Sequence, residues 1–299
     1  MDQQSWLTER FEENRPRLRG VAYRMLGSLS EAEDAVQEAW LRLNRIDTAT
    51  VENLGGWLTT VVSRVCLDML RSRKSRREEP IGAQVTEPSV ERGEGADPEG
   101  EAVLADSVGV ALLVVLDTLT PAERLAFVLH DLFAVPFDEI GSIVGRSPAA
   151  AKQLASRARR RVRGSPAPSD AGRARQREVV EAFLRAARAG DIEGLLAVLD
   201  PDAVVRIDGA ARLATGAADA VGTTREIRGA ATWVKQFVAL SRGLRFVQPV
   251  LINGSVGLIL APGGKLSRAL SFSFTNAKVT QVEVIGDPAR LRELDIAVL

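Results

Sequence analysis

Hydrophobic residues in the first half of the chain recur every three or four positions, which is the spacing of one face of an α-helix. The segment LGSLSEAEDAVQEAWLRL carries such a stripe, and Ser30 with Glu33 forms a capping box that predicts a helix start. A second helix is expected from about residue 56 to residue 77, and the helical pattern returns over residues 106–163.

From about residue 174 the pattern changes to helices followed by strands. A helical segment ends at Gly190, a short helix covers residues 192–199, and residues 204–208 alternate like a strand. After a helix at residues 232–241 come four strand-like runs, separated by NGS, PGGK and TNA. This order predicts an α+β unit with a curved antiparallel sheet.

Two polar segments divide these patterns into domains. Residues 78–105 are rich in Glu, Pro and Gly, which indicates an exposed acidic linker. Residues 165–173 form a second linker, because the Pro and Ser residues there do not sustain a helix. We therefore expect helical domains at residues 1–77 and 106–164, and an α+β domain at residues 174–299.

The formal net charge of zero conceals a strong segregation of charge along the chain. Residues 71–77 and residues 157–163 each contain five basic residues in seven, whereas residues 87–106 contain seven acidic residues and one arginine. Local charge matters more than the sum, so the basic clusters can bind an anionic partner although the whole chain is neutral.

The segment VPFDEIGSIVGRSPAAAKQLASRARRRV has the pattern of a helix-turn-helix. Pro136 suits a helix start, and Gly145 suits the C-cap position at which that helix ends. Ser147 can cap a second helix that has Pro148 as its first residue. A short glycine-containing turn between two such helices is typical of the tri-helical DNA-binding arrangement.

The second of these helices has an apolar inner stripe and an outer face of small, polar and basic residues. Small residues at its N-terminal tip permit close approach to a DNA groove, Gln and Arg can bond base edges, and trailing arginines can reach phosphates. The alternative is an ordinary hairpin with a solvated basic face, but the caps, turn and small tip together favour DNA binding. The candidate residues are Ala149, Ala150, Lys152, Gln153, Ser156, Arg157 and Arg160.

Two features of the N-terminal block have both a functional and a structural interpretation. A mixed acidic and apolar stripe suits docking on a basic protein surface, although a solvated helix face is the simpler explanation. This stripe consists of Asp34, Gln37, Glu38 and Leu41. Trp57 precedes a basic cluster, as in sites for melted DNA where bases stack and phosphates pair, but a lone tryptophan is more often a core residue.

The composition argues against several kinds of site and against a membrane location. With one cysteine, Cys66, and one histidine, His130, neither a disulfide, a Cys/His metal site nor a cofactor is expected. The neighbours of Cys66 indicate a buried helical position. The acidic N-terminus does not have the pattern of a signal peptide, and the longest apolar run, residues 108–116, is too short to span a bilayer, so the cytoplasm is the expected location.

Taken in order, three segments resemble a bacterial sigma factor of the extracytoplasmic-function group. They are LGSLSEAEDAVQEAWLRL, GGWLTTVVSRVCLDMLRSRKSRR and LTPAERLAFVLHDLFAVPFDEIGSIVGRSPAAAKQLASRARRRV. The resemblance covers about residues 5–163 and implies a sigma region 2 domain at 1–77 and a region 4 domain at 106–164. It implies a chain that binds RNA polymerase core and directs promoter-specific transcription initiation.

The resemblance also implies a role for each candidate face. The stripe of Asp34, Gln37, Glu38 and Leu41 would dock the clamp-helix coiled coil of core polymerase. The helix at residues 149–163 would contact the minus-thirty-five element. The acidic linker would run through the polymerase channels. The residues implied at the minus-ten element are Asn53, Trp57, Arg64, Asp68, Arg71 and Lys74. The group commonly has an asparagine at the position of Arg64, which leaves open the base captured there.

The residues from about 174 resemble a SnoaL-like cone-shaped domain, which one subgroup of these sigma factors carries as a C-terminal extension. The resemblance implies that this tail tunes activity in cis, and the linker reads QVTEP where the subgroup has Trp-Leu-Pro-Glu-Pro. Its motif residues are Asp208, Gly209 and Arg212 in DGAAR, and Asn253 and Gly254 in NGSVG.

The sequence alone leaves alternatives for the tail and for the chain. Domains of this shape hold small ligands and some are enzymes, but the tail has no histidine, and Asp208 before a glycine is more often a turn former than a base, so no catalytic residue is expected. The competing interpretation of the chain is a helix-turn-helix regulator with a small-ligand-sensing C-terminal domain. Such a regulator would bind its operator without polymerase.

Overall fold

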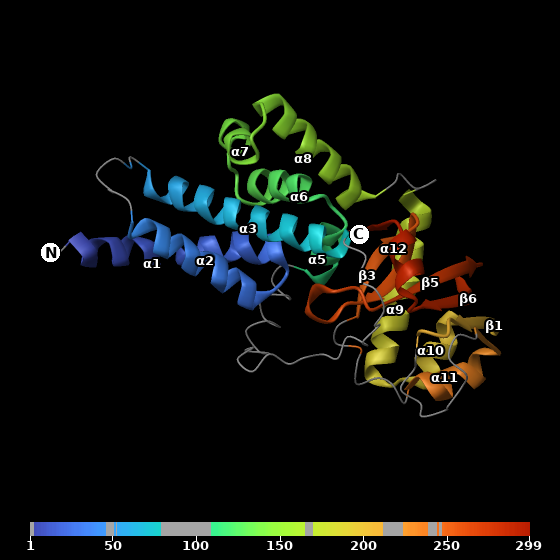
Figure 1. Ribbon diagram of the computed structural model, residues 1–299. Helices are drawn as coiled ribbons and strands as arrows, with labels where there is room; N and C mark the ends of the chain where they lie inside the picture. Colours follow the sequence, from blue (N-terminus) through green and yellow to red (C-terminus); the bar gives the residue numbers. More distant parts are fainter. Residues whose placement is uncertain are drawn as a thin grey trace. The chain divides into compact units, whose positions relative to one another are not determined.

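The computed structural model describes residues 3–45, 51, 53–78, 109–164, 170–211, 224–238, 244 and 247–299 (Figure 1). The chain divides into two compact units. The helical unit comprises residues 1–108 and 116–159, and the sheet unit comprises residues 109–115 and 160–299. The expected acidic linker lies outside the described residues, except for Glu78, which belongs to the helix before it.

Three long helices form the N-terminal part of the helical unit: α1 (Gln3–Leu26), α2 (Leu29–Leu43) and α3 (Leu54–Glu78). The apolar stripe of α2 is buried as its spacing predicts, except for the half-buried Trp40, but the predicted capping box was wrong. The N-cap is Ser28, whose hydroxyl accepts a hydrogen bond from the Glu31 amide at 3.5 Å. The spacing Ser-x-x-Glu occurs twice here, so it did not distinguish Ser28 from Ser30.

Shorter helices follow after residue 108. They are α5 (Val110–Asp117), α6 (Pro121–Phe127), a π-helical turn η2 (Val128–Leu132), α7 (Phe137–Val144) and α8 (Pro148–Arg163). Helix α6 begins with a capping box in which Thr120 and Glu123 bond each other's backbone amides. The first residues of α5 and the last residues of α8 belong to the sheet unit.

The sheet unit contains the predicted α+β fold. Its helices are α9 (Asp170–Ala189), α10 (Ile192–Val198), α11 (Ala230–Val238), a short 3-10 turn η4 (Pro262–Gly264) and α12 (Pro288–Glu293). Its strands are β1 (Leu199–Ile207), β2 (Arg225–Arg228), β3 (Val247–Ile252), β4 (Ser255–Leu260), β5 (Arg268–Thr275), β6 (Lys278–Ile285) and β7 (Ile296–Ala297). Helix α9 begins at Asp170, so the last residues of the expected linker at 165–173 are helical.

The strands form one sheet in the order β2-β1-β6-β5-β4-β3-β7. The four consecutive strand-like runs became the antiparallel strands β3 to β6, as predicted. The prediction of a wholly antiparallel sheet was wrong, because β1 pairs with β6 in parallel, with Val205 opposite Val282. A parallel pair needs a long crossover, and here α11 and four strands (β2 to β5) intervene between the two partners.

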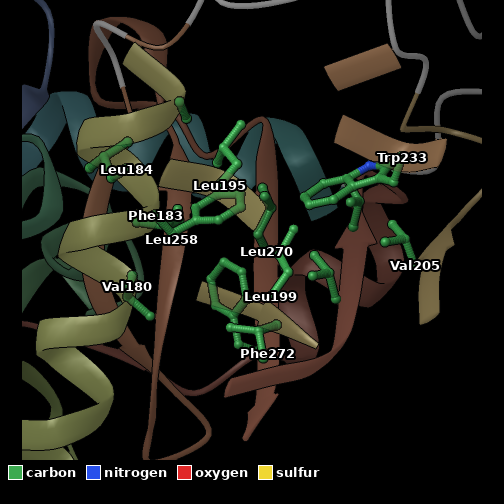
Figure 2. Packing of buried hydrophobic residues seen from close by; sticks show 14 of the residues in the cluster. Val180, Phe183, Leu184, Leu195, Leu199, Val205, Trp233, Leu258, Leu270 and Phe272 are labelled. Carbon is green, nitrogen blue, oxygen red and sulfur yellow. The ribbon is translucent and has the colours of Figure 1, made fainter. Parts of the chain in front are cut away.

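Aromatic side chains fill the core between the helices and the sheet of this unit (Figure 2). The rings of Phe183 and Trp233 stack with centroids 5.8 Å apart, and Phe272 meets Phe183 edge-on at 5.5 Å. All three side chains are buried. Because α9, α11 and β5 each contribute one ring, the core joins these elements into a single body.

Candidate nucleic-acid interface

The turn between α7 and α8 has the predicted caps. Helix α7 ends at Gly145, which has φ +71° and ψ 40°, and the Arg146 amide bonds the Gly141 carbonyl at 2.9 Å. The Ser147 hydroxyl accepts the Ala150 amide at 3.2 Å and so caps α8. A β-carbon at Gly141 would lie 2.7 Å from the Arg146 carbonyl oxygen, so this approach of the turn to α7 requires glycine.

Helix α8 separates a buried face from an open one. Ala151, Leu154, Ala155 and Ala158 are buried, as the spacing predicted. On the outer face Ala150 is half-buried, and the other candidates are exposed: Ala149, Lys152, Gln153, Ser156, Arg157 and Arg160. The structure therefore brings the seven candidates together on one accessible surface that contains three basic side chains.

The helical pair is also held by two side chains, His130 and Arg159, for which the sequence predicted no such role. His130 stacks on Phe137 with ring centroids 3.8 Å apart, and its Nδ1 lies 3.0 Å from the Val135 carbonyl oxygen. Arg159 forms an ion pair with Asp131 at 2.6 Å, which joins α8 to η2. The histidine thus has a packing role, and no periodicity of the sequence reveals it.

The candidates on and before α3 take part in more contacts within the protein than those on α8. Asn53 caps α3, because its Oδ1 accepts the Gly56 amide at 2.9 Å. Trp57 is half-buried, and the exposed Arg64 donates to the Ser142 carbonyl of α7 at 3.4 Å. Asp68 and Arg71 are exposed and lie 3.8 Å apart, whereas the side chain of Lys74 lies outside the described part.

Further arginines connect α1 with the helices after residue 116 within the helical unit. Arg124 is only 3% exposed, and its Nε donates to the Arg24 carbonyl at the end of α1 at 2.9 Å. Its Nη1 lies 3.2 Å from Asp117, and burial lowers the pKa of its guanidinium. Arg17 donates to the Phe133 carbonyl at 3.2 Å. The end of α1 is also capped by Arg73, which donates to the Leu26 carbonyl at 3.2 Å.

The stripe on α2 is accessible. Asp34, Gln37 and Leu41 are exposed, with Leu41 at 43%, and the half-buried Glu38 pairs with Arg42 at 2.9 Å. The stripe thus combines one exposed leucine with acidic and amide side chains on an accessible surface.

Cys66 lies on the buried side of α3, away from the exposed Arg64 and Asp68, and its burial raises the pKa of the thiol to about 12. This confirms the prediction of a buried helical position for Cys66. Within the described residues, no helix has the length and apolar character needed to cross a membrane.

The two tail motifs have clear structural roles. The buried Asp208 carboxylate accepts the amides of Ala211, Gly286 and Asp287 at 2.9–3.1 Å, and Arg290 lies 3.4 Å away. It is therefore a turn former that joins the end of β1 to the chain after β6. Gly209 lies in that turn, and Arg212 lies outside the described residues.

The Asn-Gly motif forms the two-residue turn between β3 and β4. Asn253 has φ +51° and Gly254 has φ +81°, as such a turn requires. Asn253 exchanges two hydrogen bonds with Asp295, at 2.8 and 3.0 Å, which attach the turn to the segment before β7.

Comparison with known proteins identifies the family. Residues 10–76 match Sigma-70 region 2, and residues 109–162 match Sigma-70, region 4. The chain is 40% identical over 281 residues to the ECF RNA polymerase sigma factor SigJ of Mycobacterium tuberculosis, covering 92% of this chain and 88% of the relative. The chain belongs to the ECF family of RNA polymerase sigma factors.

Other relatives of this sigma factor agree. It is 33% identical over 294 residues to the probable ECF RNA polymerase sigma factor SigI of Mycobacterium tuberculosis, covering 98% of both chains. A crystal structure of the SigJ protein is 34% identical, covers 95% of this chain and 98% of that chain, and gives a TM-score of 0.44. The family and sequence matches show that this sigma factor directs promoter-specific transcription initiation, and they do not favour the interpretation as an independent regulator.

Proposed function

We propose that this sigma factor holds promoter DNA at two places, with α8 at the minus-thirty-five element and α3 at the minus-ten element. The observation that carries this proposal is the open outer face of α8, on a helix whose start, turn and inner face are all fixed by local contacts. Gln153 and Arg157 would bond base edges, and Arg160 would reach a phosphate.

At the minus-ten element, the proposed contacts come from the loop before α3 and from its outer face. Trp57 would stack on an unpaired base, and Arg71 and Lys74 would neutralise phosphates. Asn53, Arg64 and Asp68 complete the set. Arg64 would reach DNA only after its side chain leaves the Ser142 carbonyl, so engagement requires this one hydrogen bond to break.

For polymerase binding, the proposed surface is the stripe on α2. Leu41 supplies the apolar contact, and Asp34, Gln37 and Glu38 surround it with acceptors for a basic partner. Because its proposed partner is core polymerase, we place the protein in the cytoplasm.

The experiment that tests these roles is run-off transcription on genomic DNA with the purified full-length chain, with and without core polymerase from the source bacterium. We expect discrete transcripts that depend on both proteins. Tight, specific binding of the chain alone to an operator, without any effect on initiation by core, would instead favour the alternative of a ligand-sensing regulator. The promoters found in this way serve in the experiments below.

We also propose that the C-terminal domain regulates initiation in cis by holding both ends of the region 4 helices. Within the sheet unit, the Ala111 amide of α5 donates to Gln248 Oε1 of β3 at 3.2 Å. The Val298 amide donates to the Val162 carbonyl of α8 at 2.9 Å. Leu113 packs against Gly264, where a β-carbon would lie 3.0 Å away. These contacts connect the tail to the helix that carries the proposed base-reading residues.

A chain truncated after Gly164 loses these contacts and should differ from the full chain in promoter output and in affinity for core. The variant Gln248→Ala, which removes one acceptor and leaves the domain in place, should shift output in the same direction by a smaller amount. Unchanged output and unchanged core affinity in both proteins would contradict regulation in cis. Thermal unfolding of each protein is the control for folding.

Catalysis by the tail is not part of this proposal. Both oxygens of Asp208, the one acid that the sequence offered as a base, are occupied by backbone amides. A small ligand of the tail remains a second candidate, and a thermal-shift screen of the full chain tests it.

A further inference from the structure

A groove of about 530 Å³ lies within the sheet unit, where the end of α8 meets the start of α9. The residues that line it are Val162, Arg163, Arg173, Ala174, Arg177, Leu251, Val298 and Leu299. Arginines from two helices thus surround an apolar floor that comes largely from β3 and the C-terminal segment. No role described so far uses these three arginines.

The apolar floor favours arginine side chains whose charged ends remain in water. The aliphatic part of an arginine side chain favours contact with apolar surface, while its charged end stays in water. Arg163 and Arg177 are exposed, and Arg173 is half-buried. A guanidinium held in this way suits a phosphate, because its planar donors form two parallel hydrogen bonds with phosphate oxygens.

Arg163 connects the groove to the proposed DNA-binding face. It follows Arg160 by three residues and Ser156 by seven, and at 3.6 residues per turn these three positions share one side of α8. The hydrogen bond from Val298 to Val162 fixes the end of α8 against the tail next to this position. The basic stripe of α8 therefore continues across the groove to Arg173 and Arg177 on α9.

We propose that this groove is a phosphate-binding extension of region 4, in which Arg163, Arg173 and Arg177 contact the DNA backbone beside the minus-thirty-five element. The proposal rests on the assignment of α8 to that element. It gives the tail a direct share in promoter affinity, without any share in sequence discrimination, because phosphate contacts are the same for every sequence.

An acidic side chain of α9 competes with DNA for Arg177. Glu181 forms an ion pair with Arg177 at 2.7 Å, and both side chains are substantially exposed. Exposed pairs of this kind are weak, so a phosphate can displace the carboxylate. Glu181 thereby moderates the affinity that the groove supplies.

The test measures the salt dependence of promoter binding by the holoenzyme. Each phosphate contact contributes about 0.9 to the slope of log K against log salt concentration, so Arg173→Ala with Arg177→Ala should lower the slope by about 1.8. The loss of affinity should be equal on a promoter and on a DNA with a scrambled minus-thirty-five element. The variant Arg173→Lys with Arg177→Lys keeps the charges and should retain most of the slope.

Arg175 provides the matched control, since it is an exposed arginine of the same helix that does not line the groove. Arg175→Ala should leave the slope unchanged. Glu181→Gln should act in the opposite direction and tighten binding at low salt, because it releases Arg177.

The proposal is overturned if the double alanine variant binds with the wild-type slope, or if Arg175→Ala lowers the slope as much. It is also overturned if the alanine variant instead loses a thermal shift with decanoate while DNA binding is unchanged, which would make the groove a site for amphiphilic anions. Arg157→Ala distinguishes this failure from failure of the α8 assignment. If Arg157→Ala weakens promoter binding and the groove variant does not, only the groove proposal fails.

Discussion

The two helices proposed to contact promoter DNA, α8 and α3, present their outer faces in different states. On α8 the base-reading candidates Gln153 and Arg157 point from a capped helix into solvent. On and before α3, two of the candidate side chains already form hydrogen bonds within the protein. Asn53 caps its own helix, and Arg64 bonds a carbonyl of α7.

The difference indicates an order of events. The proposed DNA contacts of α8 need no internal change of the protein, whereas those of α3 require protein contacts to be exchanged for DNA contacts. Exchange of an exposed hydrogen bond costs little, because water and DNA both replace it. We therefore infer that α8 supplies initial recognition and that α3 engages during melting.

The largest effect is expected from Gly141→Val, which alters the turn that holds α8. Its side chain would meet the Arg146 carbonyl oxygen, a backbone group that has no freedom to move aside. We expect a loss of about 3 kcal/mol in the free energy of unfolding, measured with urea, and loss of transcription that depends on the minus-thirty-five element. Ser142→Ala, at the next position, is the control and should change stability by less than about 0.5 kcal/mol.

Gln153→Ala should change specificity rather than stability. We expect promoter affinity to fall about 10- to 100-fold, with relaxed preference at one or two base pairs of the minus-thirty-five element. Binding to a panel of single-base promoter variants measures this. An equal loss on every promoter of the panel would show that Gln153 contacts the backbone only.

Arg64→Ala should affect the proposed melting role of α3 without affecting the proposed initial recognition by α8. It removes one exposed hydrogen bond of 3.4 Å, so stability should change by less than about 0.5 kcal/mol. Loss of one charged contact to DNA should slow open-complex formation about tenfold while initial binding is retained. Permanganate footprinting of the melted region measures open-complex formation, and a filter-binding assay measures initial binding. Loss of initial binding instead would contradict the proposed order.

The smallest effect concerns the buried side of α3. Burial raises the folded-state pKa of Cys66 to about 12 from its ordinary value of 9.0, so its contribution to stability is present below pH 9 and is lost as pH rises toward 12. From pH 8 to pH 9 the loss should be about 0.4 kcal/mol. The difference between wild type and Cys66→Ala isolates it in urea titrations, and an equal pH dependence of the two proteins would contradict the burial.

Several features set by neighbouring residues were predictable from the sequence, although the N-cap of α2 was misassigned to Ser30, and the pairings set by distant residues were not predictable. The caps at Ser147 and Gly145 depend on residues within one turn, and so they were confirmed. The parallel pairing of β1 with β6 joins segments about 75 residues apart, as Val205 opposite Val282 shows, and no local signal encodes it. The role of Arg124 was likewise missed, because an arginine in a helical pattern predicts a solvated side chain.

The same limit applies to the candidate interface. Spacing placed the seven residues of α8 on one face, since helical periodicity alone determines a face. Spacing did not indicate that Arg64 would be engaged by α7, or that Asn53 would cap α3. The start of α9 at Asp170 was missed because Ser and Pro residues before it indicated a longer break.

The arginines that join α1 and α3 to the later helices of the helical unit share one property. Arg17, Arg64 and Arg124 each donate to a main-chain carbonyl, of Phe133, Ser142 and Arg24 respectively. A carbonyl is present whatever side chain occupies the position. Substitutions can therefore accumulate at the accepting residues while the contact survives, and correlated changes between homologous sequences would not reveal it. Packing of this kind can persist through long divergence and still be invisible to any comparison of sequences.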